Sequence, residues 1–142
     1  MRHRRTTVAV TAVVLGLLLA GCAPGVPDHG PGEELVGDWH LTAASDGRGP
    51  MDIAEASITL SIGEHATKGS GPCNSVDLEV DGGPEAIAVT IGSLTQRACA
   101  DENLVGVEGR YITVLSNVVF AEAGDTTLVL RGRSGKLIYA RA

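Results

Sequence analysis

Three cysteines, at positions 22, 73 and 99, carry most of the chemistry that this 142-residue sequence offers. A thiolate is a nucleophile and a redox group, whereas two thiols in an oxidising compartment form a disulfide. A nucleophilic cysteine needs a nearby base, and His65 precedes Cys73 by eight residues, close enough for a hairpin to bring the two together. The compartment in which the protein works therefore decides between these chemistries.

The N-terminus has the three parts of a secretory signal peptide. Three arginines lie within the first five residues, an apolar run covers residues 8–20, and small residues precede Cys22. The run is shorter than the roughly 20 residues that span a bilayer. Its end, Leu19-Ala20-Gly21-Cys22, resembles a bacterial lipobox, in which the cysteine is diacylated and becomes residue one. We predict a lipoprotein signal peptide over residues 1–21 and an extracytoplasmic protein anchored to the cell membrane by acyl chains, such as palmitate, on Cys22. The alternative is an ordinary signal peptide with an incidental cysteine.

Lipidation of Cys22 leaves Cys73 and Cys99 as two cysteines in an oxidising compartment. A disulfide between them closes a loop of about 27 residues, which stabilises the fold by roughly 3–4 kcal/mol in the chain-entropy model. We predict this disulfide, with a free, reactive thiol as the competing hypothesis.

Charge narrows the possible partners. After removal of residues 1–21 the chain has 121 residues, with 8 Lys and Arg against 17 Asp and Glu, a net charge of −9. This balance argues against nucleic acid and against electrostatic binding to anionic lipid. It suits a cationic partner, although acidic charge more often serves solubility alone. We predict no cofactor and no nucleic-acid partner.

The pattern along the chain indicates one domain. Residues 22–32 are rich in proline and glycine and are typical of a flexible tether, so the domain covers residues 33–142. Alternating apolar residues predict about seven short strands, over residues 35–42, 58–62, 76–81, 87–91, 118–121, 126–131 and 136–141. Helical spacing over 102–116, with Asp101 as cap, predicts one inserted helix. The fold class is mainly β, with a small antiparallel curved sheet or barrel and one α-helix.

Four motifs occur in a fixed order that resembles a known family. They are Leu35-x-Gly-x-Trp39-x-Leu41, Gly69-Ser-Gly-Pro-Cys73-Asn74, Thr95-Gln-Arg-Ala-Cys99 and Glu108…Tyr111…Leu115. Together they resemble the META/HslJ-type domain (DUF306), a small domain of the bacterial envelope that often follows a lipobox. The sequence departs from the family at Pro72, before the cysteine, and at Arg97, where an apolar residue is common. The resemblance implies a barrel-like β domain with one helix and a link to envelope stress and drug tolerance, and it implies no reaction.

A structural role is the favoured interpretation of the Cys-Asn and Thr-x-x-x-Cys motifs. Asn74, which follows the turn at Gly71, can bond to backbone groups and hold a turn, and Thr95 can fix the loop that enters the helix. With the disulfide, these residues would attach the start of the helix to the sheet. A binding or redox role is the alternative. Trp39 lies on the inward face of the first strand, so we expect core packing rather than a ligand anchor.

Three carboxylates, Asp77, Glu79 and Asp81, share one face of one strand. They suit a docking edge for a basic partner, whereas a solvated face that deters edge-to-edge pairing is the simpler interpretation. The histidines at 29, 40 and 65 show no zinc-site spacing. We therefore expect no enzyme and no metal, but a stress-response or interaction module that acts on another envelope protein or a small apolar molecule. The alternatives are an inhibitor of a basic hydrolase such as lysozyme and a thiol-dependent redox protein.

Overall fold

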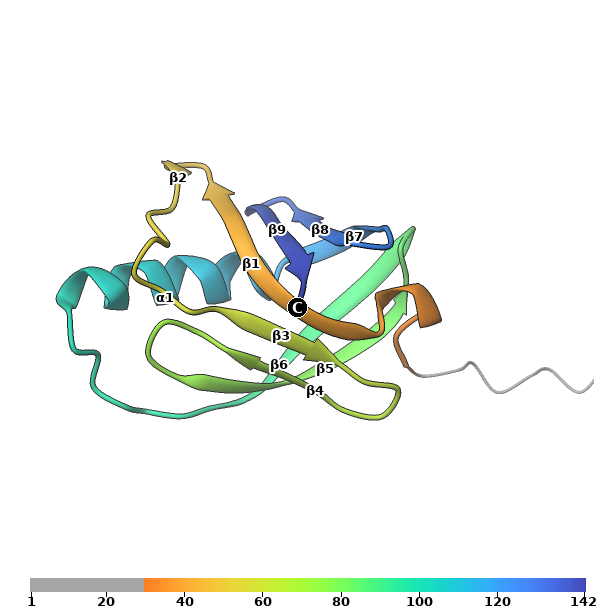
Figure 1. Ribbon diagram of the computed structural model, residues 1–142, viewed down its shortest axis with the longest axis horizontal. Helices are drawn as coiled ribbons and strands as arrows, with labels where there is room; N and C mark the ends of the chain where they lie inside the picture. Colours follow the sequence, from red (N-terminus) through yellow and green to blue (C-terminus); the bar gives the residue numbers. More distant parts are fainter. Residues whose placement is uncertain (1–29) are drawn as a thin grey trace, which may run out of the picture.

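Nine antiparallel β-strands and one α-helix form a single curved, barrel-like sheet with its helix in residues 30–142, the part of the chain that the computed structural model describes (Figure 1). The strands are β1 (Gly37–Asp46), β2 (Gly49–Pro50), β3 (Thr59–Ile62), β4 (Thr67–Ser70), β5 (Ser75–Gly83), β6 (Ala86–Leu94), β7 (Val118–Ala123), β8 (Thr127–Gly132) and β9 (Gly135–Arg141). The sheet order is β6-β5-β4-β3-β1-β9-β8-β7, with β2 paired to β1. The predicted fold class is confirmed.

Period-two alternation places one apolar face of each strand inside. In β5, Val76, Leu78 and Val80 are buried while the residues between them face outward. Trp39 on β1 is also buried, as predicted, and its indole Nε1 donates to the Leu35 carbonyl at 3.0 Å. Aliphatic side chains from all the long strands complete one contiguous core.

The helix α1 (Glu102–Leu115) connects β6 to β7 and agrees with the predicted range to within one residue. The Asp101 carboxylate caps it by accepting from the Asn103 N–H at 2.8 Å, as predicted. The helix packs against β1, β8 and β9, at the end of the barrel away from the β5–β6 turn (Figure 1). Its buried apolar residues are Val107, Tyr111, Val114 and Leu115. Among the described residues no helix is long and apolar enough to cross a membrane.

The sequence predicted about seven strands; the structure has these seven and two short ones, β2 and β4, that were not predicted. Gly69 and Ser70 carry strong turn signals, but they pair with β3 and β5 as part of β4. The β2 pairing is only two residues long and follows the turn after Asp46, where no strand was predicted. In both places tertiary pairing overrides the local preference of glycine and proline.

One further boundary differs from the prediction. Leu35 belongs to a short 3-10 helix (Glu33–Leu35) rather than to the first strand. Residues 30–32, at the end of the predicted tether, contact β5: the Gly82 N–H donates to the Gly30 carbonyl and the Gly32 N–H donates to the Gly82 carbonyl, each at 3.0 Å. Gly82 has a φ of +89°, a conformation that side chains rarely adopt, so this contact depends on glycine. The signal peptide, Cys22, residues 22–29 of the tether and His29 lie outside the described residues.

The barrel is closed unevenly. The strands β6 and β7, at the two ends of the sheet order, lie side by side. In the described residues no hydrogen-bonded ladder joins them, and the backbone bond across the gap runs from the Ala121 N–H to the Pro84 carbonyl at 2.8 Å. The contact therefore lies near the start of β6.

Candidate functional site

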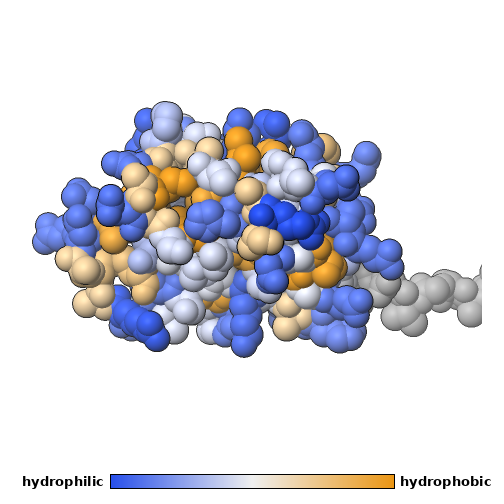
Figure 2. Space-filling model, viewed as in Figure 1, coloured by the Kyte–Doolittle hydropathy of each residue, from blue (hydrophilic) through white to orange (hydrophobic). Residues whose placement is uncertain are grey.

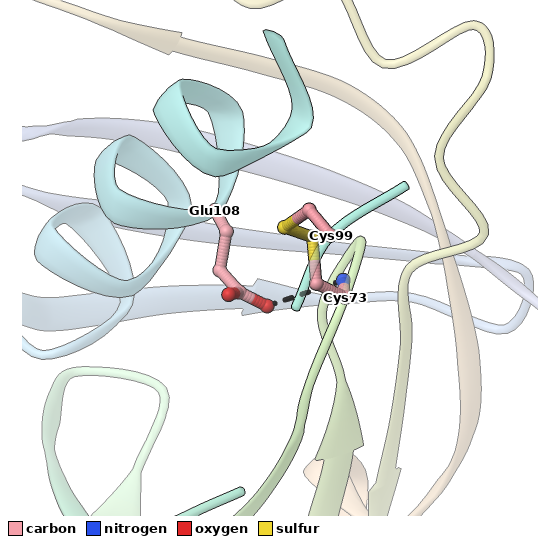
Figure 3. A group of neighbouring side chains, drawn as sticks. All are labelled: Cys73, Cys99 and Glu108. Carbon is pink, nitrogen blue, oxygen red and sulfur yellow. Dashed lines mark hydrogen bonds between the residues drawn. A yellow bond between two sulfur atoms is a disulfide. The ribbon is translucent and has the colours of Figure 1, made fainter. Parts of the chain in front are cut away.

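The two downstream cysteines form the predicted disulfide. Cys73 lies between β4 and β5, and Cys99 lies two residues before the helix cap at Asp101. Their Cα atoms are 5.1 Å apart, a usual separation for a disulfide. The bond ties the segment entering α1 to the sheet (Figure 3).

A buried carboxylate lies beside this disulfide. Glu108 projects from α1 toward the Cys73 segment and is 9% exposed (Figure 3). Its Oε1 accepts from the backbone N–H groups of Cys73 at 3.2 Å and Asn74 at 2.8 Å. Its Oε2 accepts from Asn74 Nδ2 at 2.7 Å. A Cβ at Gly71 would lie 2.7 Å from Oε1, so glycine at this position leaves the carboxylate room to approach the turn.

Asn74 connects Glu108 to the loop that leads into the helix. While its amide nitrogen donates to Glu108, its Oδ1 accepts from Thr95 Oγ1 at 3.0 Å and from the Arg97 N–H at 2.6 Å. Thr95 Oγ1 in turn accepts from the Ser75 N–H at 3.0 Å. Asn74 and Thr95 therefore bond to nearby backbone groups, as expected, at Arg97 and Ser75. The direct bond between the two side chains and the bonds to Glu108 were not predicted. We call the disulfide together with Glu108, Asn74 and Thr95 the junction.

Glu108 belongs to one of the four motifs of the sequence, but its contact with the Cys73 segment was not predicted, although a signal was present. Glu108 occupies the helical face that also carries Leu104, Tyr111 and Leu115, where an acid is out of place. A charged residue on an apolar stripe requires buried partners, and the junction provides them.

The junction does not provide thiol or metal chemistry in its oxidised form. The ligand atoms of Cys73, Cys99 and Glu108 all lie within 4.8 Å of one another. Zinc binds thiolates, however, and both sulfurs are in the disulfide. His65 lies in the β3–β4 turn, at the opposite end of β4 from Cys73, so the hypothetical cysteine–histidine pair is not formed.

A second polar contact holds the helix from another side. Arg110 donates through Nε and Nη2 to the two carboxylate oxygens of Asp46, at 2.8 and 2.7 Å, and through Nη2 to the Gly49 carbonyl at 2.8 Å. The Arg110 guanidinium holds the pKa of the Asp46 carboxyl well below its usual range. This pair joins α1 to the β1–β2 turn, and nothing in the local sequence indicated it.

Tyrosine hydroxyls meet inside the barrel. Tyr111 and Tyr139 are fully buried, and their hydroxyl oxygens lie 3.2 Å apart. Burial raises the pKa of Tyr111 to about 12, so both phenols remain neutral. The Arg141 guanidinium lies 4.2 Å from the centroid of the Trp39 ring. The two tyrosine side chains fill the barrel interior, whereas Arg141 is exposed.

The three predicted docking carboxylates follow the outer face of β5. Asp77 and Glu79 are exposed and Asp81 is partly exposed. Asp77 accepts a hydrogen bond from Ser93 Oγ at 2.6 Å. Glu79 and Asp81 also line a surface cavity of about 410 Å³ with Glu64 and His65. His40 lies exposed on β1, away from this group.

Comparisons with known proteins support the fold. An NMR structure of a protein from Burkholderia xenovorans has a TM-score of 0.60 and 17% identity, covering 91% of this chain and 99% of that one. A crystal structure of a DUF4847 family protein from Bacteroides vulgatus ATCC 8482 has a TM-score of 0.55 and 12% identity, covering 75% of this chain and 92% of that one. No curated protein matches the sequence. Residues 33–142 match the META domain, and because that match spans most of the chain, the protein belongs to the META domain family.

Proposed function

We propose that this chain is a lipid-anchored protein of the bacterial envelope that acts by binding a protein partner, with a role in envelope stress, rather than by catalysis. The observation that carries this proposal is the junction. Its reactive residue types are bound to one another, with both sulfurs in a disulfide and the Glu108 oxygens accepting three hydrogen bonds. A disulfide is also expected in an exported protein, which supports the extracytoplasmic location proposed from residues 1–22.

The surface supports a polar or charged partner more than an apolar one. Hydrophilic side chains cover most of the face seen in Figure 2, and the apolar side chains there form small separate patches. The barrel interior is packed with buried side chains, which speaks against a small apolar ligand inside it. In residues 30–142, 16 Asp and Glu stand against 8 Lys and Arg.

The acidic face of β5 favours a basic protein as the partner. Glu79, Asp81 and Glu64 gather around one cavity, and acidic charge of this density steers basic proteins toward it. This observation supports the candidate function of inhibiting a basic hydrolase such as lysozyme.

The first test addresses the anchor and the disulfide. We would measure the intact mass of the natively exported protein, alkylated before and after reduction. We expect a diacyl mass and no alkylation until reduction. Two alkylated thiols without reduction would overturn the non-catalytic proposal, and an unmodified Cys22 would overturn the anchor.

The second test addresses the partner. We would measure the binding of a basic lysozyme to the full-length chain, and the inhibition of that enzyme, at low and high salt. We expect binding at low salt, weakened in high salt and in the double variant Glu79→Gln/Asp81→Asn. Glu122→Gln, which removes an exposed carboxylate on β7, is the control and should bind as the wild type does. No binding at low salt would overturn the hydrolase candidate.

A further inference from the structure

The second half of β6 and the segment after it form an unusual strand edge. Residues 86–96 contain no charged residue and no proline, although the domain around them is strongly acidic. Residues 92–98 are all exposed, and Leu94 is exposed at 40%. The contact between β7 and β6 lies near Pro84, at the other end of β6. Proteins usually protect such edges with charges, proline or bulges. This edge carries neither charge nor proline, and its pairing with β5 has one register shift, at Gly92 between Ile91 and Ser93.

The backbone of this edge is held from one side. The Thr95 N–H donates to the Ser75 carbonyl at 3.0 Å, and the Arg97 N–H donates to Asn74 Oδ1 at 2.6 Å, both toward β5. Successive amides of an extended chain point to opposite sides. The N–H and C=O groups of Leu94, the last residue of β6, therefore face away from β5, in the direction from which another strand would pair.

The neighbouring side chains define what such a strand would contain. On the outer face, Glu79 is paired with Thr90, and Asp81 is paired with Ala88. An added strand would lie about 10 Å from β5, two strand spacings away. The β6 side chains between them are small, so long Lys or Arg side chains of the added strand can extend over them to the carboxylates. Two cations lie nearby: Lys68 is paired with Asp77 across β4 and β5, and Arg97 follows the edge. The strongest attraction is therefore at Glu79 and Asp81.

A second copy of this chain fits this edge poorly. It would bring its own Glu79 and Asp81 beside the first pair, and the predicted mature chain carries a net charge of −9. Like charges on adjacent strands oppose pairing. A basic segment gains from the same carboxylates.

We infer that residues 90–96 form a strand-addition site, where an extended segment of a basic partner with Lys or Arg at alternate positions pairs with β6 and reaches Glu79 and Asp81. This inference rests on the proposed binding function and names its partner class and geometry. Main-chain hydrogen bonds supply affinity, and alternate side chains supply specificity.

The test uses the full-length chain and a labelled nine-residue peptide with Lys at alternate positions and Val or Thr between them. Binding is measured by fluorescence anisotropy. Leu94→Pro removes an outward amide without removing a bond to β5, and Leu94→Thr is its matched control. A second peptide has the same sequence but is N-methylated at alternate amides, which removes hydrogen-bond donors and leaves its charge unchanged. Intact mass and thermal unfolding confirm that the variants are folded and oxidised.

We expect Leu94→Pro and the methylated peptide to weaken binding by about tenfold or more, since each removes main-chain bonds that contribute about 1 kcal/mol apiece. Leu94→Thr should change it less than about twofold. Glu79→Gln/Asp81→Asn should weaken binding several-fold and reduce its salt dependence. Should only the charge variant weaken binding, strand addition would be overturned while the proposed basic partner would stand. Failure of the peptide to bind while lysozyme binds would likewise overturn strand addition and leave the proposed basic partner standing. Self-association of the wild-type chain that Leu94→Pro abolishes would assign the edge to a second copy and overturn the inference.

Discussion

The polar groups of the junction are bonded to one another, whereas those of the seam between β6 and β7 are largely left open to solvent. At the junction, a disulfide joins two segments of the chain covalently. Hydrogen bonds from and to the buried amide of Asn74 connect these segments to the carboxylate of Glu108 and to Thr95. At the seam, one backbone hydrogen bond joins the strands near Pro84, and the edge beyond it remains open. The cysteines, Glu108 and Asn74 therefore hold segments of this domain together, whereas the uncharged strand edge is the part that we propose for recognition.

The largest effect is expected from loss of the disulfide. The double variant Cys73→Ser/Cys99→Ser should lower the free energy of unfolding by about 3–4 kcal/mol, because the unfolded chain regains the entropy of an open loop. Chemical denaturation monitored by circular dichroism measures this difference. A loss below about 1 kcal/mol, within the range of ordinary substitutions, would show that the polar contacts alone hold the junction.

Removal of the buried carboxylate should have the next largest effect. Glu108→Ala leaves the N–H groups of Cys73 and Asn74 and the Asn74 amide without their acceptor. We expect a loss of about 2–3 kcal/mol, since unsatisfied buried donors are costly. Glu108→Gln keeps one acceptor oxygen and should lie between Ala and wild type. The exposed Glu122→Ala serves as control, with an expected change under about 1 kcal/mol, and an equal loss in the two alanine variants would contradict the role given to the junction.

The contact between Arg110 and Asp46 should make stability depend on acid pH. Because the folded pKa of Asp46 lies below its ordinary value of 3.8, the pair contributes fully above that value, and its contribution falls as the pH drops further. Denaturation curves of wild type and Asp46→Asn should therefore differ most at neutral pH and converge below about pH 4. A constant difference across this range would show that Asp46 is not stabilised by its charge.

Amide hydrogen exchange compares the two regions directly and requires no substitution. The Arg97 N–H donates into the junction, whereas the Leu94 N–H faces the open edge. Hydrogen exchange should be slow at Arg97 and fast at Leu94 in the free protein, because exchange follows local hydrogen bonding and opening. Addition of the basic peptide should slow exchange at Leu94. Slow exchange there in the free protein would mean that the edge is already covered.

Several features could be predicted because their signals are local or depend on composition. The helix after Asp101 follows from apolar spacing and a capping residue, and the disulfide follows from the count of cysteines once Cys22 is set aside. Other features could not. Gly69 and Ser70 carry turn signals, yet the strands on both sides of them impose β4. Arg110 and Asp46 are 64 residues apart, and no local pattern connects them.

Four properties could be predicted from the residues alone: the alternation of each long strand, the position of the helix, the acidic balance and the pairing of Cys73 with Cys99. These properties depend on neighbouring residues or on simple counts. The tertiary structure alone decided that Glu108 accepts from the Cys73 and Asn74 segment and that β6 ends as an open edge. Both depend on how a curved sheet brings distant segments together, and the curvature arises from the packing of the whole core rather than from any one stretch of residues.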